Sequence, residues 1–313
     1  VYGAGSPIGQ TFHEGDGLGE ALDGAFLTCD MVRKELMAYR PKAKDAQVEM
    51  GEPRALVGLK PDQRKQRFLP TDVVVGTDGA IYLSDFFNDT SRRTNQLSGT
   101  IYRITRKDRA NPRPPKINFA SDAGLVAALQ SPARNVRTVA VNKLVARGDA
   151  VFGQMQQLFE SAKNSFVRAR PIWVMAQLGP KGQGFVRELL DSKNRQDRLV
   201  AYRALRFAQP KGLMAMAEKM ASDKDPAVRR EVALSLRNVP YPEAKDALAQ
   251  VIADYDGKNR WYLEAIGAAA DGRSDIIYDE LVRPAHAKRS AAEWNQQAIN
   301  LAWRLHTPRA IDD

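Results

Sequence analysis

The chain has 313 residues, 27% of them charged, and a mean hydropathy of −0.43, which indicates a soluble globular protein with a substantial buried core. Its apolar runs fall far short of the roughly 20 residues that a membrane helix needs, and a single cysteine, Cys29, excludes an intrachain disulfide framework and a thiolate-rich zinc site. The net charge of +10 lies wholly after residue 106, because residues 1–106 hold 14 basic and 14 acidic side chains. This asymmetry predicts two domains and raises the question of an anionic partner for the second.

Residues 1–106 alternate with period two between Gly, Pro, Asp and Asn residues, as antiparallel strands do. We expect strands near residues 6–13, 24–29, 32–39, 47–50, 55–59, 71–76, 80–86 and 99–106. These strands make about two four-stranded sheets, each resembling one blade of a β-propeller. A propeller typically closes with four to eight blades. We therefore expect further blades upstream of Val1, which makes this chain a fragment of a longer protein.

The best-defined hairpin is FLPTDVVVGTDGAIYLSDF, in which Gly76, Asp78 and Gly79 are expected to form the turn, since Asp-Gly favours the positive φ that a tight connection needs. Asp72 precedes the first strand of this hairpin and is a candidate cofactor-binding residue. The alternative is that it caps the local turn with its own side chain.

A candidate metal site follows the second strand of this hairpin. Asp85, Asn88 and Asp89 supply oxygen donors of the kind that Ca²⁺ accepts. Their spacing matches no defined calcium loop, so the alternative is an ordinary polar loop.

Residues 107–119, which begin KDRANPRPPK, are rich in proline and basic side chains and are expected to be a linker. From residue 120 to residue 313 the apolar period becomes helical, and a repeat of 30–31 residues appears. Its register is marked by five arginines at spacings of 31, 30, 31 and 31: Arg137, Arg168, Arg198, Arg229 and Arg260. About six helix pairs are expected, and the last of them carries an insertion. A stack of such pairs is an α-solenoid.

The recurring arginines are assigned a structural role, because a residue that every repeat carries at one position usually serves the repeat. We expect them to bond carbonyls or acidic groups at the turns between repeats. The alternative is a basic ladder that binds phosphates. The helical part of the chain has a net charge of only +7, so nucleic acid is not an expected partner.

The 30–31-residue units resemble HEAT-like repeats, and the D-P-x-V-R signature of those repeats is nearly complete in DKDPAVRRE. The segment DVVVGTDGAIYLSD, followed by GTIYRI, is similar to the propellers of soluble glucose and sorbosone dehydrogenases. The order of the two parts resembles large secreted planctomycete and verrucomicrobial proteins, which carry a dehydrogenase-like propeller, a HEAT array and a C-terminal c-type cytochrome segment.

This resemblance implies an extracytoplasmic protein that oxidises a sugar or alcohol and passes the electrons to a c-type haem. It also implies pyrroloquinoline quinone and Ca²⁺ in the full-length protein. Leu69 and Thr71 stand where the dehydrogenases have quinone-binding arginines, and no C-x-x-C-H occurs, so any haem is expected outside these residues.

Three functions follow from these observations: a fragment of an extracytoplasmic sugar-type dehydrogenase with a carbohydrate-type substrate, a non-catalytic scaffold that binds a protein partner on its HEAT surface, and an anion-binding HEAT protein. The sequence shows no complete acid–base or nucleophile–base set, and no catalytic residue is assigned.

Overall fold

The computed structural model of the chain describes residues 5–15, 17–60, 62, 68–88, 97–108, 113–209, 211–286 and 288–313. The chain forms two compact units. The first consists of Val1–Lys42 and Glu49–Arg170, and the second of Ala43–Val48 and Pro171–Asp313. Both units contain strand and helix residues, so the division between them does not coincide with the change from strands to helices along the chain. The domain limits expected from the sequence, 1–106, 107–119 and 120–313, stay a prediction.

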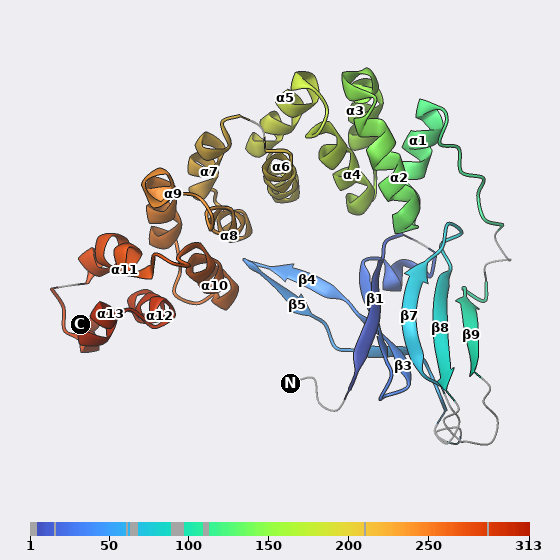
Figure 1. Cartoon of the computed structure of the whole chain (residues 1–313), viewed down its shortest axis with the longest axis horizontal. Helices are drawn as coiled ribbons and strands as arrows, with labels where there is room; N and C mark the ends of the chain where they lie inside the picture. Colours follow the sequence, from blue (N-terminus) through green and yellow to red (C-terminus); the bar gives the residue numbers. More distant parts are fainter. Residues whose placement is uncertain are drawn as a thin grey trace. The chain divides into compact units, whose positions relative to one another are not determined.

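The N-terminal part of the chain is built from antiparallel strands (Figure 1). They are β1 (Pro7–His13), β2 (Ala25–Asp30), β3 (Glu35–Tyr39), β4 (Pro41–Lys44), β5 (Gln47–Met50), β6 (Arg54–Gly58), β7 (Pro70–Val75), β8 (Ile81–Asn88) and β9 (Leu97–Ile104). One sheet has the order β1-β2-β3-β6, a second has the order β7-β8-β9, and β4 pairs with β5. The mixed architecture of small antiparallel sheets followed by a helical solenoid therefore agrees with the predicted fold class.

The arrangement of the strands differs from the two four-stranded sheets expected from the sequence. The segment 47–50 was expected to belong to a sheet with its neighbours, but as β5 it pairs with β4, a strand that the sequence analysis did not identify. Asp45, between these two strands, has a φ of 50°. This left-handed conformation, which Asp tolerates better than most residues, lets the chain reverse in two residues. The expected strand 55–59 forms as β6 and pairs with β3 in the first sheet, so among the described residues the second sheet has three strands rather than four.

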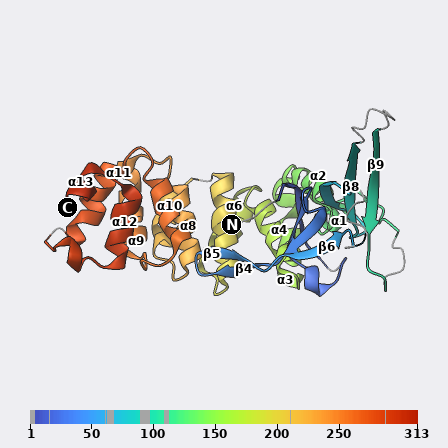
Figure 2. The ribbon, with the colours of Figure 1, turned by 90° about the horizontal axis from the view of Figure 1, so that it is seen from below.

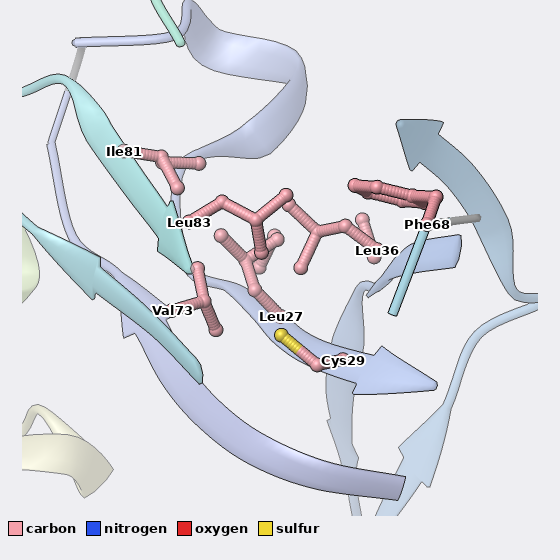
Figure 3. Close-up of a cluster of buried hydrophobic side chains, with 9 residues drawn as sticks. Leu27, Cys29, Leu36, Phe68, Val73, Ile81 and Leu83 are labelled. Carbon is pink, nitrogen blue, oxygen red and sulfur yellow. The ribbon is translucent and has the colours of Figure 1, made fainter. Parts of the chain in front are cut away.

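The core of the first unit lies between the two larger sheets. The buried cluster contains Ala25, Leu27, Cys29, Leu36, Ala38, Phe68, Val73, Ile81 and Leu83. Figure 3 shows the Cys29 sulfur beside Leu27, inside this cluster. Burial, with the charge of Asp72 as a second cause, raises the pKa of the Cys29 thiol to about 12. Cys29 is therefore a packed apolar side chain, and its thiol is protonated at neutral pH.

The two sheets approach each other closely where β1 crosses β7. A Cβ atom on Gly9 would lie 2.3 Å from the Cα of Asp72, which is closer than real Cβ atoms come to backbone. Only glycine allows this approach.

From residue 122 onward the chain is helical. The α-helices are α1 (Asp122–Leu129), α2 (Arg134–Val145), α3 (Phe152–Ser161), α4 (Ser165–Met175), α5 (Pro180–Glu188), α6 (Arg195–Ala208), α7 (Leu213–Ala221), α8 (Pro226–Ser235), α9 (Tyr241–Ala253), α10 (Arg260–Ala269), α11 (Ser274–Ile277), α12 (Gln296–Leu305) and α13 (Pro308–Asp312). In the second unit α7 contacts α9 and α8 contacts α10, so that first helices and second helices form two layers, as in a HEAT-like solenoid (Figure 1). Figure 2 shows α6, α8, α10 and α12 following one another along the second unit.

The helix starts follow from local sequence. The side chains of Asn194, Asp225, Asn259 and Asn295 each accept a hydrogen bond from a backbone N–H in the first turn of the following helix. These bonds satisfy donors that have no partner within the helix. The predicted insertion in the last repeat appears as a π-helical segment, Tyr278–Val282, followed by two short 3₁₀ turns before α12.

Candidate functional site

The turn between β7 and β8 is built by the residues that the sequence assigned to it. The Gly76 N–H donates to the Ala80 carbonyl over 2.8 Å, and the Gly79 N–H donates to the Gly76 carbonyl over 3.0 Å. Gly79 has a φ of 76°, which a residue with a side chain adopts only with strain.

Asp78 is the centre of a polar cluster that joins this turn to β8 and β9. Its Oδ1 accepts the Ala80 N–H at 3.0 Å, and its Oδ2 accepts the Arg103 Nε–H at 2.9 Å and an Nη2–H at 2.8 Å. The Tyr82 hydroxyl donates to the same oxygen at 3.3 Å. Burial alone would raise the pKa of Asp78, but these hydrogen bonds and the Arg103 charge outweigh it and lower the pKa. The sequence analysis placed Asp78 in the turn and missed its partner Arg103, although both residues lie in the quoted motif.

Asp72 bonds locally. Its Oδ1 accepts the N–H of the next residue, Val73, at 2.8 Å. The two neighbouring positions are also engaged, since the Leu69 N–H donates to Asp85 Oδ1 over 2.8 Å and the Thr71 hydroxyl lies 2.9 Å from that of Ser84.

The candidate calcium loop is described only at its first residue. Besides the bond from Leu69, Asp85 Oδ2 accepts the Tyr102 hydroxyl at 3.4 Å. The side chain of Asn88 and all of Asp89 lie outside the described residues. Within the described part of the chain, no three His, Cys, Asp or Glu side chains come together as a metal site. A calcium site at this loop stays a prediction.

A groove of about 1220 Å³ lies within the first unit, between the strands and α2. It is lined by Gln10, Thr11, Phe12, Glu14, Phe26, Asp72, Val73, Val74, Val75, Gly76, Thr77, Tyr82, Pro132, Ala133, Arg134, Asn135, Arg137 and Thr138. Its strand side carries aromatic rings, since Phe12 and Phe26 have their ring centroids 5.1 Å apart and Tyr39 continues the row 6.4 Å beyond Phe26. We refer to this feature as the β1–β7 groove.

One end of the β1–β7 groove is held by a half-buried ion-pair cluster. Glu14, just after β1, lies 2.7 Å from an Arg170 nitrogen and 3.5 Å from an Arg137 nitrogen. Arg170 also donates to the Leu129 carbonyl over 3.0 Å. Desolvation lowers the pKa of Arg137 from its usual high value, but Glu14 opposes that effect and the guanidinium remains charged. The cluster ties α2 and α4 to the segment that follows β1.

The first four arginines of the repeat make comparable contacts at the start of each second helix. Arg137 donates to the carbonyls of Ser131 and Pro132, and Arg168 donates to the Phe159 carbonyl over 2.7 Å. Arg229 donates to the Asp223 carbonyl over 2.6 Å and to the Asp254 carbonyl over 3.2 Å. These bonds satisfy carbonyls at the ends of first helices and in the turns, which have no partner within a helix.

Arg198 is the most deeply buried of the set. Its Nε and Nη2 donate to the two carboxylate oxygens of Asp223 over 2.7 and 2.8 Å, and its Nη1 donates to the Ser192 carbonyl over 2.9 Å. Only 5% of the Arg198 side chain and 6% of the Asp223 side chain are exposed. This bidentate geometry fixes one repeat against the turn of the next.

Arg260 does not share this position, which corrects the register expected from the sequence. Arg198 and Arg229 lie four residues after the caps Asn194 and Asp225, whereas Arg260 follows its cap Asn259 directly. The caps Asp225 and Asn259 are 34 residues apart, whereas Asn194 and Asp225 are 31 apart, so the equivalent position in α10 is Leu263, which is buried. The Arg260 side chain is 81% exposed and lies 3.6 Å from Glu264.

The described residues show no constellation for acid–base or nucleophilic chemistry. The histidine hydrogen bonds there join His13 to the Leu22 carbonyl and His286 to Tyr278, and none joins a histidine to a Ser, Thr or Cys side chain. The thiol of Cys29 is buried and protonated.

The cofactors implied by the resemblance stay a prediction for the full-length protein. A covalently bound c-type haem needs a C-x-x-C-H segment, whereas Cys29 is the single cysteine and its sulfur lies in the core. At the strand that matches the quinone-binding blade, Leu69 and Thr71 carry no positive charge for a quinone carboxylate.

The architecture and the contacts define a class of protein: small antiparallel sheets joined to a HEAT-like α-solenoid. Residues 182–267, which cover most of α5 through α10, match the family model of HEAT repeats. Among solved structures, the chain is similar to the crystal structure of AlkD2 from Streptococcus mutans, with 17% sequence identity and a TM-score of 0.33 over 48% of this chain and 80% of that chain. A likeness of this size carries no further argument. No curated protein matches the chain. Across the described residues, no helix combines the length and apolar character needed to cross a membrane.

We expect Arg198→Ala to lower the free energy of unfolding by about 3–5 kcal/mol, because it leaves the buried carboxylate of Asp223 without its charged partner. Arg260→Ala is the matched control and should change stability by less than about 0.5 kcal/mol, since its side chain is exposed. Urea denaturation followed by circular dichroism measures both. Equal midpoints for the two variants would contradict the structural role assigned to Arg198.

We expect the Asp78–Arg103 contact to make stability depend on pH in the acid range. The folded state lowers the pKa of Asp78, so its contribution is present above the unfolded pKa of about 3.9 and is lost as pH falls through the folded pKa. Asp78→Asn lacks this titration. The gap in unfolding free energy between the two proteins should therefore be largest near neutral pH and shrink below about pH 4. A gap that does not change with pH would rule out the ionised contact.

Proposed function

We propose that this chain is a non-catalytic binding module that holds an extended peptide segment of a partner protein in the β1–β7 groove. The groove itself is the observation that carries the proposal. It combines aromatic and aliphatic side chains on one wall with polar side chains on the other, which is the composition of a recognition site rather than of a core.

The strand wall offers exposed apolar contacts. Phe12 on β1 and Val74 on β7 are 51% and 52% exposed, although the neighbours of Val74 along the strand, Val73 and Val75, are buried. Such side chains gain the most when a partner removes them from water. Phe26 extends the same apolar surface on β2.

The edge of β7 supplies the second element. β7 pairs with β8 on one side only. On its other side Gly9 of β1 packs against Asp72, and the edge beyond this contact, Val73 to Val75, lines the groove. An edge strand presents unpaired backbone donors and acceptors along alternate residues. An extended peptide adds to such an edge through main-chain hydrogen bonds and places alternate side chains against the neighbouring surface. In this arrangement Asp72 marks one end of the peptide site, because its side chain already accepts the Val73 N–H and leaves that donor unavailable to a peptide.

The helical wall adds a polar rim. Arg134, Asn135 and Thr138 project from α2, and all three are exposed. HEAT-type arrays expose long surfaces that bind other proteins, so a peptide bound beside α2 also agrees with the repeat class. A phosphate-binding arginine ladder finds less support, because four of the repeat arginines already donate hydrogen bonds to carbonyls or a carboxylate of the chain. They are Arg137, Arg168, Arg198 and Arg229.

Selection of linear peptides from a display library against the whole chain tests this function. We expect enriched peptides with alternating apolar residues, and we expect Phe12→Ser and Val74→Ser to weaken their binding about tenfold or more. The matched control is Ile101→Ser, on β9 and outside the groove, where the side chain is 75% exposed. Fluorescence anisotropy measures the affinities. The proposal fails if no peptide is enriched, or if the two groove variants bind as the wild type does.

A second candidate is the extracytoplasmic dehydrogenase fragment, with haem and pyrroloquinoline quinone bound outside these residues and a sugar or alcohol as substrate. The dehydrogenase-like motif favours it, because its residues form the ordered sheet β7-β8-β9 and the Asp78–Arg103 contact within it.

The dehydrogenase candidate predicts dye reduction by the protein as its source makes it, after addition of pyrroloquinoline quinone, Ca²⁺ and an aldose. A haem stain on the same sample reports the electron acceptor. Absence of turnover with every aldose tried, in a sample that still binds the selected peptides, would leave the binding module as the function.

A further inference from the structure

A second cavity, unrelated to the β1–β7 groove, lies wholly within the second unit. It has a volume of about 300 Å³ and opens between the C-terminal end of α9, the π-helical segment Tyr278–Val282 and the N-terminal half of α12. The size falls at the lower end of small-molecule pockets. We call it the α9–α12 pocket.

The walls of the α9–α12 pocket are mostly apolar. Eight of its twelve lining residues are Ala, Ile, Leu or Val, with Ile252, Leu281, Val282 and Leu301 the largest of them. The π-helical segment contributes Leu281 and Val282 to this wall. Single π-helical turns inside helices are often found at functional sites, because the extra residue redirects side chains. The pocket therefore favours an aliphatic or aromatic ligand body.

Only one charged residue lines the pocket, and it is a cation. Arg289 has its backbone held in place, since its N–H donates to the His286 carbonyl over 2.9 Å and its carbonyl accepts the Trp294 indole N–H at 3.4 Å. Within the described part of the chain, its guanidinium makes no hydrogen bond or ion pair. The acid nearest in sequence, Glu293, is engaged by the N–H and the hydroxyl of Ser290. The Arg289 charge helps to lower the pKa of the Glu293 carboxyl, but no ion pair joins the two side chains among the described residues, so the exposed guanidinium is open to a ligand.

His286 is the other notable polar group in the lining. It is 4% exposed, its Nε2 lies 3.4 Å from the Tyr278 hydroxyl, and its ring meets that of Trp294 edge-on at 4.2 Å. Burial lowers the pKa of His286 below its usual value, so the ring is neutral at pH 7. His286 therefore acts as a neutral polar wall, and Arg289 alone sets the sign of the ligand charge.

We infer that the α9–α12 pocket binds a small amphipathic carboxylate, with an apolar body of about ten non-hydrogen atoms in the cavity and its carboxylate on Arg289. The lining contains no acidic residue that would repel the carboxylate. The N-terminus of the ten-residue helix α12 lies at the same pocket and adds a favourable positive field. A guanidinium and a carboxylate match in geometry as well as in charge.

Isothermal titration of the whole chain with octanoate tests this inference, with butyrate and 1-octanol as comparison ligands. We expect one octanoate per chain with a dissociation constant of millimolar or tighter, and weaker binding of butyrate, which leaves most of the cavity empty. Arg289→Gln should weaken octanoate binding about tenfold or more and leave 1-octanol nearly unchanged.

Ala285→Trp places a large side chain at an exposed position of the lining and should abolish binding of both ligands without unfolding the chain. Arg260→Gln, an exposed arginine outside the pocket, is the matched control and should bind as the wild type does. The site is wrong if octanoate gives no saturable heat with the folded wild type, or if Ala285→Trp still binds it. The head-group assignment is wrong if Arg289→Gln retains full affinity for octanoate.

Discussion

The solenoid depends on one constraint: a buried or half-buried arginine near the start of a second helix needs bonding partners for its guanidinium. A guanidinium taken out of water is tolerated only when carbonyls or carboxylates replace the lost water. Arg137, Arg168, Arg198 and Arg229 meet this condition with the turn carbonyls of their own repeat, and Arg198 and Arg229 also reach the next repeat along the chain. The same hydrogen bonds satisfy both the guanidinium donors of the arginine and carbonyl acceptors at helix ends, so one residue type supplies partners for both groups at each turn. This structural role explains why arginine recurs at this position of the repeat better than binding of a common ligand does.

Charged side chains of the first unit are also held in ion pairs that join different elements. Asp78 joins the turn after β7 to β9 through Arg103, and Glu14 joins the segment after β1 to α2 and α4 through Arg137 and Arg170. These contacts leave the adjacent groove wall free of unpaired charge apart from Arg134 and Asp72, so the surface that remains is apolar and aromatic. The groove and the ion pairs are therefore parts of one arrangement, in which polar residues position the walls and apolar residues face the open space.

The two proposed sites differ in what they can recognise. The β1–β7 groove is long, lies along the edge of a strand and has an apolar wall opposite a polar one, which suits an extended peptide. The α9–α12 pocket is small and has a single cation, which suits a compact amphipathic anion. Neither site brings an acid, a base and a nucleophile together among the described residues. Both proposals therefore concern binding.

Local sequence determined most of the secondary structure. The helical period, the Asn and Asp caps and the Gly-Thr-Asp-Gly turn are decided by residues within a few positions of each other, so the repeat, the class of fold and the hairpin followed from the sequence alone. The register of Arg260 did not, because periodicity cannot show that this repeat is three residues longer than the one before it, which places Leu263 in the arginine position. The β4–β5 hairpin and the Arg103 partner of Asp78 likewise depended on which strands pair. Only the tertiary structure showed that Glu14 contacts Arg170, 156 residues away, and which residues line the groove and the pocket. Such contacts arise from packing between elements far apart in the chain, and the local pattern of either element does not indicate its partner.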